Sequence, residues 1–85
     1  MDLKAQFEAA VAESKLLSSR PSNDILLKLY SLYKQAVDGD APAEGPTGMF
    51  DIVGKAKHNA WAALKGKGSE ESMQAYIDLV NELKG

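Results

Sequence analysis

Two tyrosines and a lysine in the second quarter of the chain have a spacing that would group them on a helix. Tyr30, Tyr33, Lys34 and Val37 follow an i, i+3, i+4, i+7 pattern, which places them on one side. Two phenols beside an ammonium group offer flat apolar surface, two hydroxyls and one positive charge. This combination suits a ligand that carries an aromatic ring and a phosphate. The motif alone is weak, because tyrosines on helices more often lie at the edge of a core.

Lys57 is a second candidate for binding an anion. Helical spacing over residues 51–64 places it inside an otherwise apolar arc, one turn from both Val53 and Trp61. Lysine is almost never fully buried without a partner. Either its stem extends along the aromatic surface toward water, or its ammonium group faces an anionic ligand. Tyr76 stands in a later apolar stripe, and Lys57, a backbone group or a ligand is the expected partner of its hydroxyl.

Catalytic and metal chemistry find no support in the sequence. The chain has no cysteine and a single histidine, which excludes disulfides, a cysteine nucleophile and a multi-histidine metal site. That residue, His58, lies opposite the centre of its helix's apolar arc, so we expect it to be solvated. The spacing yields no Ser–His–Asp arrangement, and the glycines form no phosphate-binding loop. We therefore expect no catalytic residue and no metal site.

The charge balance limits the kinds of partner. Ten basic and twelve acidic side chains give a net charge of −2, which argues against a nucleic-acid partner. Locally, four lysines and one aspartate give a net +3, at Lys55, Lys57, Lys65, Lys67 and Asp51. Such a patch either steers an anionic ligand or is simply a solvated surface.

Four helices are predicted to position these residues. Residues 2–17 contain no glycine or proline and repeat apolar side chains at helical spacing. Ser22 is a good N-cap for a second helix, which should end near Val37. Three glycines and two prolines at residues 38–48 then predict a long loop. Such a loop allows an overhand crossing, so neighbouring helices need not all be antiparallel.

The second half of the chain predicts two more helices. One covers about residues 51–64 and ends near Gly66, and Ser69 caps another that runs to about residue 84. We find no alternating strand pattern, so the fold class is all-α, a small four-helix bundle with a long loop between helices two and three. The chain is expected to form a single domain over residues 1–85. No apolar run is long enough to span a bilayer and no secretion signal is recognisable, so we expect no stable membrane insertion.

The second helix has more apolar surface than a helix on the surface of a bundle needs. Its apolar arc covers about 220° at 100° per residue, whereas about 100° would suffice. The remaining polar strip consists of Ser31, Gln35 and Lys28. Either neighbouring helices clamp this helix on two sides, or its surplus surface forms a ligand groove or a partner surface.

The motifs together resemble the acyl-CoA-binding protein family over essentially the whole chain. The resemblance is carried by FEAA at 7–10, RP at 20–21, YSLYKQA at 30–36, GD at 39–40, PTGMFD at 46–51, GKAK at 54–57, AW at 60–61, LKG at 64–66 and MQAYI at 73–77. It implies a non-enzymatic, cytoplasmic, monomeric carrier without a cofactor. Such a carrier binds medium- to long-chain fatty acyl-CoA esters one-to-one, for transport and pool formation. Enzymes that use acyl-CoA would be its further partners.

The resemblance also implies roles for individual residues. Tyr30, Lys34 and Lys57 would hold the 3′-phosphate of the CoA ribose, and Tyr33 would pack on the adenine. Tyr76 would contact the nucleotide and help to close the site.

The same resemblance assigns four further contacts. Lys15 matches an additional family contact to the ligand. The groove for the acyl chain would be lined by Leu26, Leu27 and Met49. Two residues depart from the family pattern, because Val53 replaces a frequent lysine and His58 replaces a frequent tryptophan. The loop at 41–48 is also one residue longer than the commonest form.

Two other functions remain open at this point. The wide apolar face of the second helix could bind a partner helix, which would make the chain a protein-interaction module. A peptide groove does not need lysines within its apolar arc unless the peptide is acidic. A thioester hydrolase is the third possibility, but the sequence supplies no activated nucleophile with its base.

Overall fold

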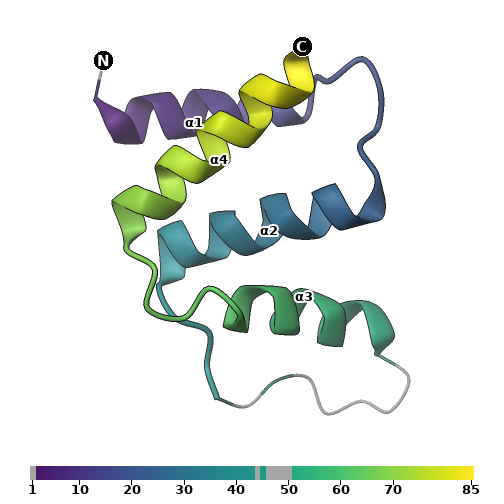
Figure 1. Cartoon of the computed structure of the whole chain (residues 1–85), viewed down its shortest axis with the longest axis vertical. Helices are drawn as coiled ribbons and strands as arrows, with labels where there is room; N and C mark the ends of the chain where they lie inside the picture. Colours follow the sequence, from purple (N-terminus) through teal and green to yellow (C-terminus); the bar gives the residue numbers. More distant parts are fainter. Residues whose placement is uncertain (1, 44, 46–50) are drawn as a thin grey trace.

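The computed structural model describes residues 2–43, 45 and 51–85. This part of the chain forms helices and no strands: α1 (Leu3–Ser14), α2 (Asn23–Asp38), α3 (Ile52–Ala62) and α4 (Ser69–Lys84) (Figure 1). The predicted all-α fold, with its long connection between the second and third helices, is confirmed. Within these ranges no helix is both long and apolar enough to cross a membrane.

Side-chain caps from the sequence start the first three helices. Asp2, Ser22 and Asp51 each accept a hydrogen bond from the backbone N–H three residues further on, at 2.7, 3.3 and 3.0 Å respectively. Each bond satisfies one of the N–H groups that a helix start leaves without a partner. The prediction that Ser22 caps α2 is therefore confirmed.

The start of α4 differs from the prediction. Gly68 is the N-cap residue, and no side chain caps this helix. Ser69 is already helical, and its hydroxyl donates instead to the backbone oxygen of Ala36 at 2.7 Å. The hydroxyl has found an acceptor on a different helix, so Ser69 ties the start of α4 to the end of α2.

Two helices end earlier than the periodicity indicates. α1 ends at Ser14 and α3 at Ala62, two or three residues short of the predicted ends at 17 and 64. At both ends the backbone tightens into bonds spanning three residues, such as Lys15 N–H to the Ala12 oxygen at 3.2 Å. Tight final turns of this kind are common at helix ends.

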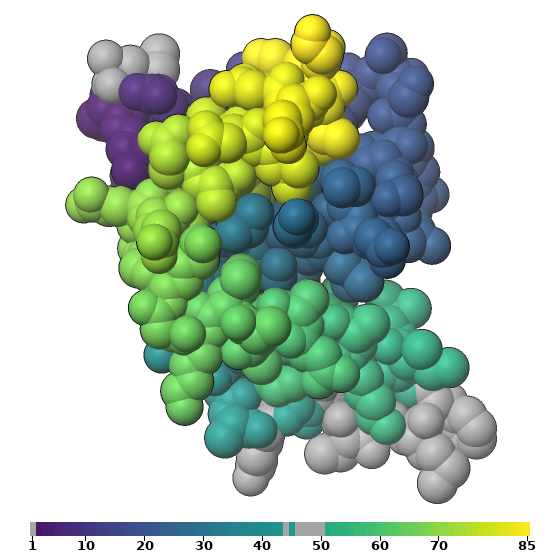
Figure 2. Space-filling model, viewed as in Figure 1, coloured from purple at the N-terminus to yellow at the C-terminus, as the bar shows by residue number. Residues whose placement is uncertain are grey.

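α2 is the central helix of the bundle. It packs against α3 on one side and against α4 on the other, while α1 packs against α4. α2 and α3 run in the same direction and α4 runs back against them (Figure 1). The overhand connection that the long loop allowed is therefore present. Figure 2 shows the blue surface of α2 between α4 and α3.

The buried core is formed by α1, α2 and α4. Its members are less than a tenth exposed, and they are Phe7, Ala10, Leu29, Leu32, Ala36, Tyr76, Ile77, Leu79 and Val80. α3, whose residues are all described, contributes none. The helix that carries Lys57 thus lies outside the main core and depends on its contact with α2.

Two of the three residues in the polar strip of α2 are buried, contrary to what their polarity suggests, and the third, Lys28, is exposed. Ser31 is 4% exposed and Gln35 is 1% exposed, whereas Tyr33 and Val37 are 39% and 54% exposed. The cause is the position of α2 between α3 and α4, because this position covers Ser31 and Gln35 and leaves part of the apolar arc open. The surplus apolar surface therefore faces outward.

Gln35 is the centre of a hydrogen-bonded cluster, which we call the α2 clasp and which comprises Gln35, Asp40, Gly66 and Lys67. The Gln35 amide donates to the Asp40 carboxylate at 2.8 Å and to the Lys67 backbone oxygen at 3.0 Å. The Gly66 N–H donates to the same carboxylate at 2.9 Å. Gly66 has φ of +89°, a conformation that favours glycine, as the predicted end of the third helix requires.

The α2 clasp should make stability depend on pH in the acid range. The Gly66 N–H, and next the Gln35 amide, hold the pKa of Asp40 below its ordinary value of 3.8. Since the folded pKa is the lower one, this contribution is complete above the unfolded pKa and disappears as pH falls through the folded pKa. As pH falls from about 5 to about 2, we expect the free energy of unfolding to decrease more for the native protein than for the Asp40→Asn variant. Urea unfolding across this range tests it, and two parallel stability curves would contradict it.

Candidate functional site

An apolar groove lies between α2 and α3. Its volume is about 590 Å³, and its aliphatic lining consists of Leu26, Leu27, Ile52, Val53 and Ala56. Leu26 and Leu27 are half-buried, as expected for residues that line an open groove. Ile52 and Val53 are 75% and 64% exposed, so they form an outer rim. Met49, the third predicted lining residue, lies outside the described residues.

Tyr30 and Lys57 meet at this groove, although they come from different helices. Both line it, and the Lys57 ammonium lies 5.2 Å from the centroid of the Tyr30 ring. This is the geometry of a cation–π contact. Lys57 is exposed, so its stem follows the aromatic surface while its charge remains in water. In the described part of the chain it forms no ion pair, which leaves the ammonium group available to an anion.

Lys34 has a different environment from Lys57. Its ammonium group pairs with the Asp38 carboxylate one turn later and lies 5.0 Å from the centroid of the Trp61 ring. The hydrogen bond to Asp38 is the main reason that the pKa of Lys34 is raised. Trp61 is itself fixed, because its indole N–H donates to the Gly39 backbone oxygen at 2.7 Å.

A smaller hollow of about 290 Å³ adjoins the groove and shares Tyr30 and Lys57 with it. Tyr30, Lys57 and Trp61 all line it. Lys34 lines neither this hollow nor the α2–α3 groove, but its ammonium lies over the ring of Trp61, which does line the hollow. The structure therefore brings together three of the predicted head-group residues, Tyr30, Lys34 and Lys57.

Tyr33 lies beside a second groove, between α1 and α2. That groove has a volume of about 520 Å³, and Phe7, Tyr33 and Met73 are among its lining residues. The Tyr33 ring stacks on Phe7 with centroids 5.9 Å apart. The sequence placed Tyr30 and Tyr33 on one side of a helix, and the structure divides them between two grooves. Lys34 is close to both tyrosines, because both phenols contribute, after Asp38, to its raised pKa.

Tyr76 is part of the core and its hydroxyl partner is not one of those expected. It is 4% exposed, donates to the Ser14 hydroxyl at 3.0 Å and meets the edge of Phe7 at 5.2 Å. In the structure the partner of this hydroxyl is Ser14 on α1, and neither Lys57 nor a backbone group takes that place. Lys15 follows Ser14 at the end of α1 and is exposed. Contact of Tyr76 and Lys15 with a ligand stays a prediction.

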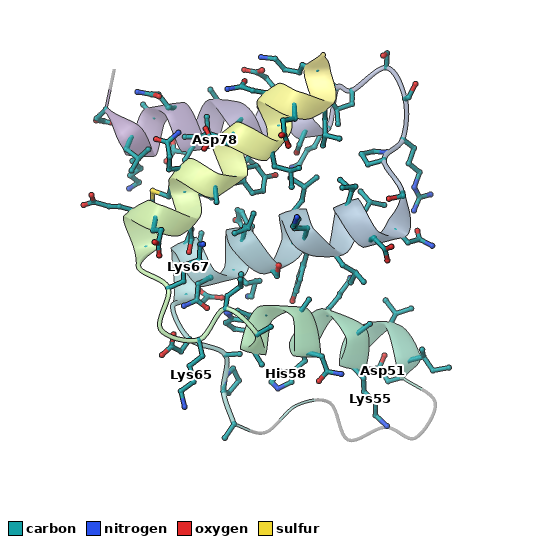
Figure 3. The ribbon with its side chains drawn as sticks, in the orientation of Figure 1. Asp51, Lys55, His58, Lys65, Lys67 and Asp78 are labelled. Atoms are coloured by element: carbon teal, nitrogen blue, oxygen red, sulfur yellow. The ribbon has the colours of Figure 1, made fainter. Side chains whose placement is uncertain are left out.

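His58 is half-buried, so the expectation of a solvated side chain is wrong. The backbone at Gly45 packs against its ring, and a Cβ at that position would lie 2.6 Å from His58 Cδ2. His58 lies on the side of α3 away from α2 (Figure 3). The backbone at Gly45 thus covers His58 on this outer face of α3.

Three residues of the site were not singled out from the sequence. Trp61 and Asp38 contact Lys34, and Phe7 supports Tyr33. The i, i+4 spacing of Lys34 and Asp38 was a visible signal. The other two contacts join residues far apart in the chain, which periodicity does not detect.

The family assignment follows from comparison with known proteins. A family model described as acyl CoA binding protein matches residues 4–80. The chain belongs to the acyl-CoA-binding protein family. The resemblance seen in its motifs is therefore confirmed, and the match covers all four helices except the ends of the first and last.

Individual relatives of this family are similar along nearly their whole length. Acyl-CoA-binding protein homolog 1 of Caenorhabditis elegans is 49% identical over 77 residues, covering 91% of this chain and 88% of that protein. The Drosophila melanogaster acyl-CoA-binding protein homolog is 49% identical over 78 residues, covering 92% and 90%. The crystal structure of Oryza sativa Acyl-CoA-Binding Protein 2 has a TM-score of 0.86 at 39% identity, covering 96% of this chain and 90% of that one.

The grooves of this acyl-CoA-binding protein family member can be compared with the groups that a ligand would need. The described residues contain no cluster of three or more His, Asp or Glu side chains that could hold a metal ion. The groups that the grooves do present are apolar surface, phenols and ammonium groups. These groups can bury a hydrocarbon chain, stack on a ring and attract phosphates.

Proposed function

We propose that this protein binds medium- to long-chain fatty acyl-CoA esters one-to-one and carries and stores them in the cytoplasm without altering them. The proposal further holds that it acts as a monomer, needs no cofactor and delivers its ligand to enzymes that use acyl-CoA. It binds no nucleic acid and does not insert stably into a membrane.

One observation supports this proposal above the others. The apolar α2–α3 groove ends at Tyr30 and Lys57, so a hydrocarbon site and a cation site adjoin. An acyl chain gains about 0.8 kcal/mol for each CH₂ that it buries, or roughly 10 kcal/mol for sixteen carbons as an upper bound. Association costs reduce this gain, so nanomolar binding, about −12 kcal/mol, requires head-group contacts as well.

The head group is assigned to the cationic end of the groove. Tyr30, Lys34 and Lys57 would hold the 3′-phosphate, and the exposed face of Tyr33 would receive the adenine. Leu26 and Leu27 would contact the acyl chain. The lysines matter because the protein as a whole has a net charge of −2 and would otherwise repel an anionic ligand.

The test is isothermal titration calorimetry with hexadecanoyl-CoA, free CoA and free hexadecanoate. We expect tight one-to-one binding of the thioester and much weaker binding of both fragments, because the groove and the cations must be occupied together. Absence of thioester binding would refute the proposal. Release of free thiol during a long incubation, followed with a thiol reagent, would refute the non-catalytic part.

The protein-interaction alternative is not favoured. The outward apolar surface of α2 borders the two grooves, and lysines stand at the end of one of them. We therefore expect acyl-CoA, and no protein partner, to be the ligand that free CoA displaces from this face. A protein partner that free CoA displaced would restore the alternative.

A further inference from the structure

Asp38 occupies an unfavourable position for a carboxylate. It is the last residue of α2, and the last turn of this helix has no basic residue. The C-terminal end of a helix carries partial negative charge, so a carboxylate there is disfavoured. Its compensation is the ion pair with Lys34, one turn earlier. Asp38 is therefore a residue that helix stability alone does not explain.

The Asp38 carboxylate is already paired with Lys34, one of the two cations at the candidate phosphate site. Lys34 lies between Asp38 and the Trp61 ring, which is 5.0 Å from the ammonium nitrogen. The side chains of Lys34 and Asp38 are 28% and 45% exposed, so the pair is open to water and to an incoming ligand. A phosphate that approaches Lys34 must share the ammonium with a group of its own charge.

Lys57 provides the contrast within the same site. Its ammonium lies over the Tyr30 ring and, in the ranges that the structure describes, has no carboxylate partner. The two cations are thus unequal: one is available and the other is already paired. An aromatic ring carries no net charge, whereas a carboxylate offsets the positive charge that the lysine presents to a ligand.

We propose that Asp38 competes with the ligand's phosphate for Lys34 and thereby weakens binding and speeds release. This inference rests on the proposed acyl-CoA function and adds a determinant of affinity to it. The expected effect is modest, because an exposed i, i+4 pair is weak and screened by water. Removal of the competing charge should lower Kd about fivefold, rather than a hundredfold.

The experiment compares Asp38→Asn with a matched control that changes the net charge equally. Asp78 on α4 is the control, because it is exposed, accepts a hydrogen bond from Gln74 and lies outside both grooves (Figure 3). We expect Asp38→Asn to lower the Kd for hexadecanoyl-CoA about fivefold and to slow its dissociation, with Asp78→Asn close to the native protein. The Asp38→Asn protein should unfold at the native temperature or above, since the carboxylate at the helix end is removed.

A Lys34→Met background shows whether Asp38 acts through Lys34. There, Asp38→Asn should leave Kd unchanged. An equal gain in both backgrounds, an equal gain from Asp78→Asn, or weaker binding by Asp38→Asn would each overturn the inference. If the native protein binds tightly and only these comparisons fail, the role of Asp38 fails alone. If the native protein does not bind hexadecanoyl-CoA, the proposed function fails and this inference fails with it.

Discussion

Replacing Lys57 by alanine is expected to weaken the binding of hexadecanoyl-CoA by at least about 1.5 kcal/mol, or more than tenfold in Kd. The ammonium lies over Tyr30 at the end of the α2–α3 groove and is not engaged by any described carboxylate. The ligand phosphate would therefore lose a charged hydrogen bond. Titration calorimetry measures the loss directly.

Two comparisons separate the charge of Lys57 from its other contributions. Lys57→Met keeps the hydrocarbon stem and should bind about as weakly as Lys57→Ala, since the loss is electrostatic. Lys55→Ala is the matched surface control, because Lys55 is exposed on α3 and lines neither groove (Figure 3). Unfolding stability should hardly change, because Lys57 is exposed. If Lys57→Ala unfolds the protein and affinity per folded molecule is unchanged, the residue is structural.

Phe7→Ala is expected to have the largest effect on stability, a loss of about 3–5 kcal/mol. The ring is 4% exposed and contacts Tyr33 in a stacked geometry and Tyr76 edge-on. Its removal leaves a cavity where α1, α2 and α4 meet. Domains of this kind have only about 5–15 kcal/mol in total, so the change is large. Urea unfolding followed by circular dichroism measures it.

The variant Phe7→Leu distinguishes cavity formation from loss of aromatic contacts. Leucine keeps most of the buried apolar volume, so the stability loss should fall to about 1–2 kcal/mol. Both variants remove the ring on which Tyr33 stacks, and both should bind hexadecanoyl-CoA more weakly at a temperature where they are folded. Native affinity in folded Phe7→Leu would show that Tyr33 needs no support from α1.

The sequence predicts the helices well because the signals for them are local. Side-chain caps such as Ser22 and Asp51 act within three residues, and periodicity identifies the apolar faces. Helical periodicity gives the wrong burial for Gln35, which it places in a solvated strip although the side chain is 1% exposed. Its partners, Asp40 and the Lys67 backbone, lie outside its helix. A polar side chain whose partners are non-local cannot be recognised as buried from its own helix.

The candidate site shows the same division between local and distant contacts. The placement of Lys57 in an apolar arc and of Tyr30 on the edge of another was sufficient to propose both as site residues. The hydrogen bond between Tyr76 and Ser14 joins positions 62 residues apart, which no spacing rule within one helix detects. Asp38 is the opposite case, because its i, i+4 relation to Lys34 is local and visible in the sequence. Its proposed effect on affinity, however, follows only once a ligand phosphate is placed near Lys34.

The peripheral position of α3 has a consequence for how a ligand enters and leaves. In the described ranges α3 packs against α2 alone, and none of its own residues is buried. Its detachment would therefore expose little of the core, so this helix belongs to the part of the fold with the lowest free energy of local opening. An acyl chain held between α2 and α3 would supply the apolar contacts that α3 otherwise lacks. On the proposed function, release would require α3 to detach while α1, α2 and α4 stay folded.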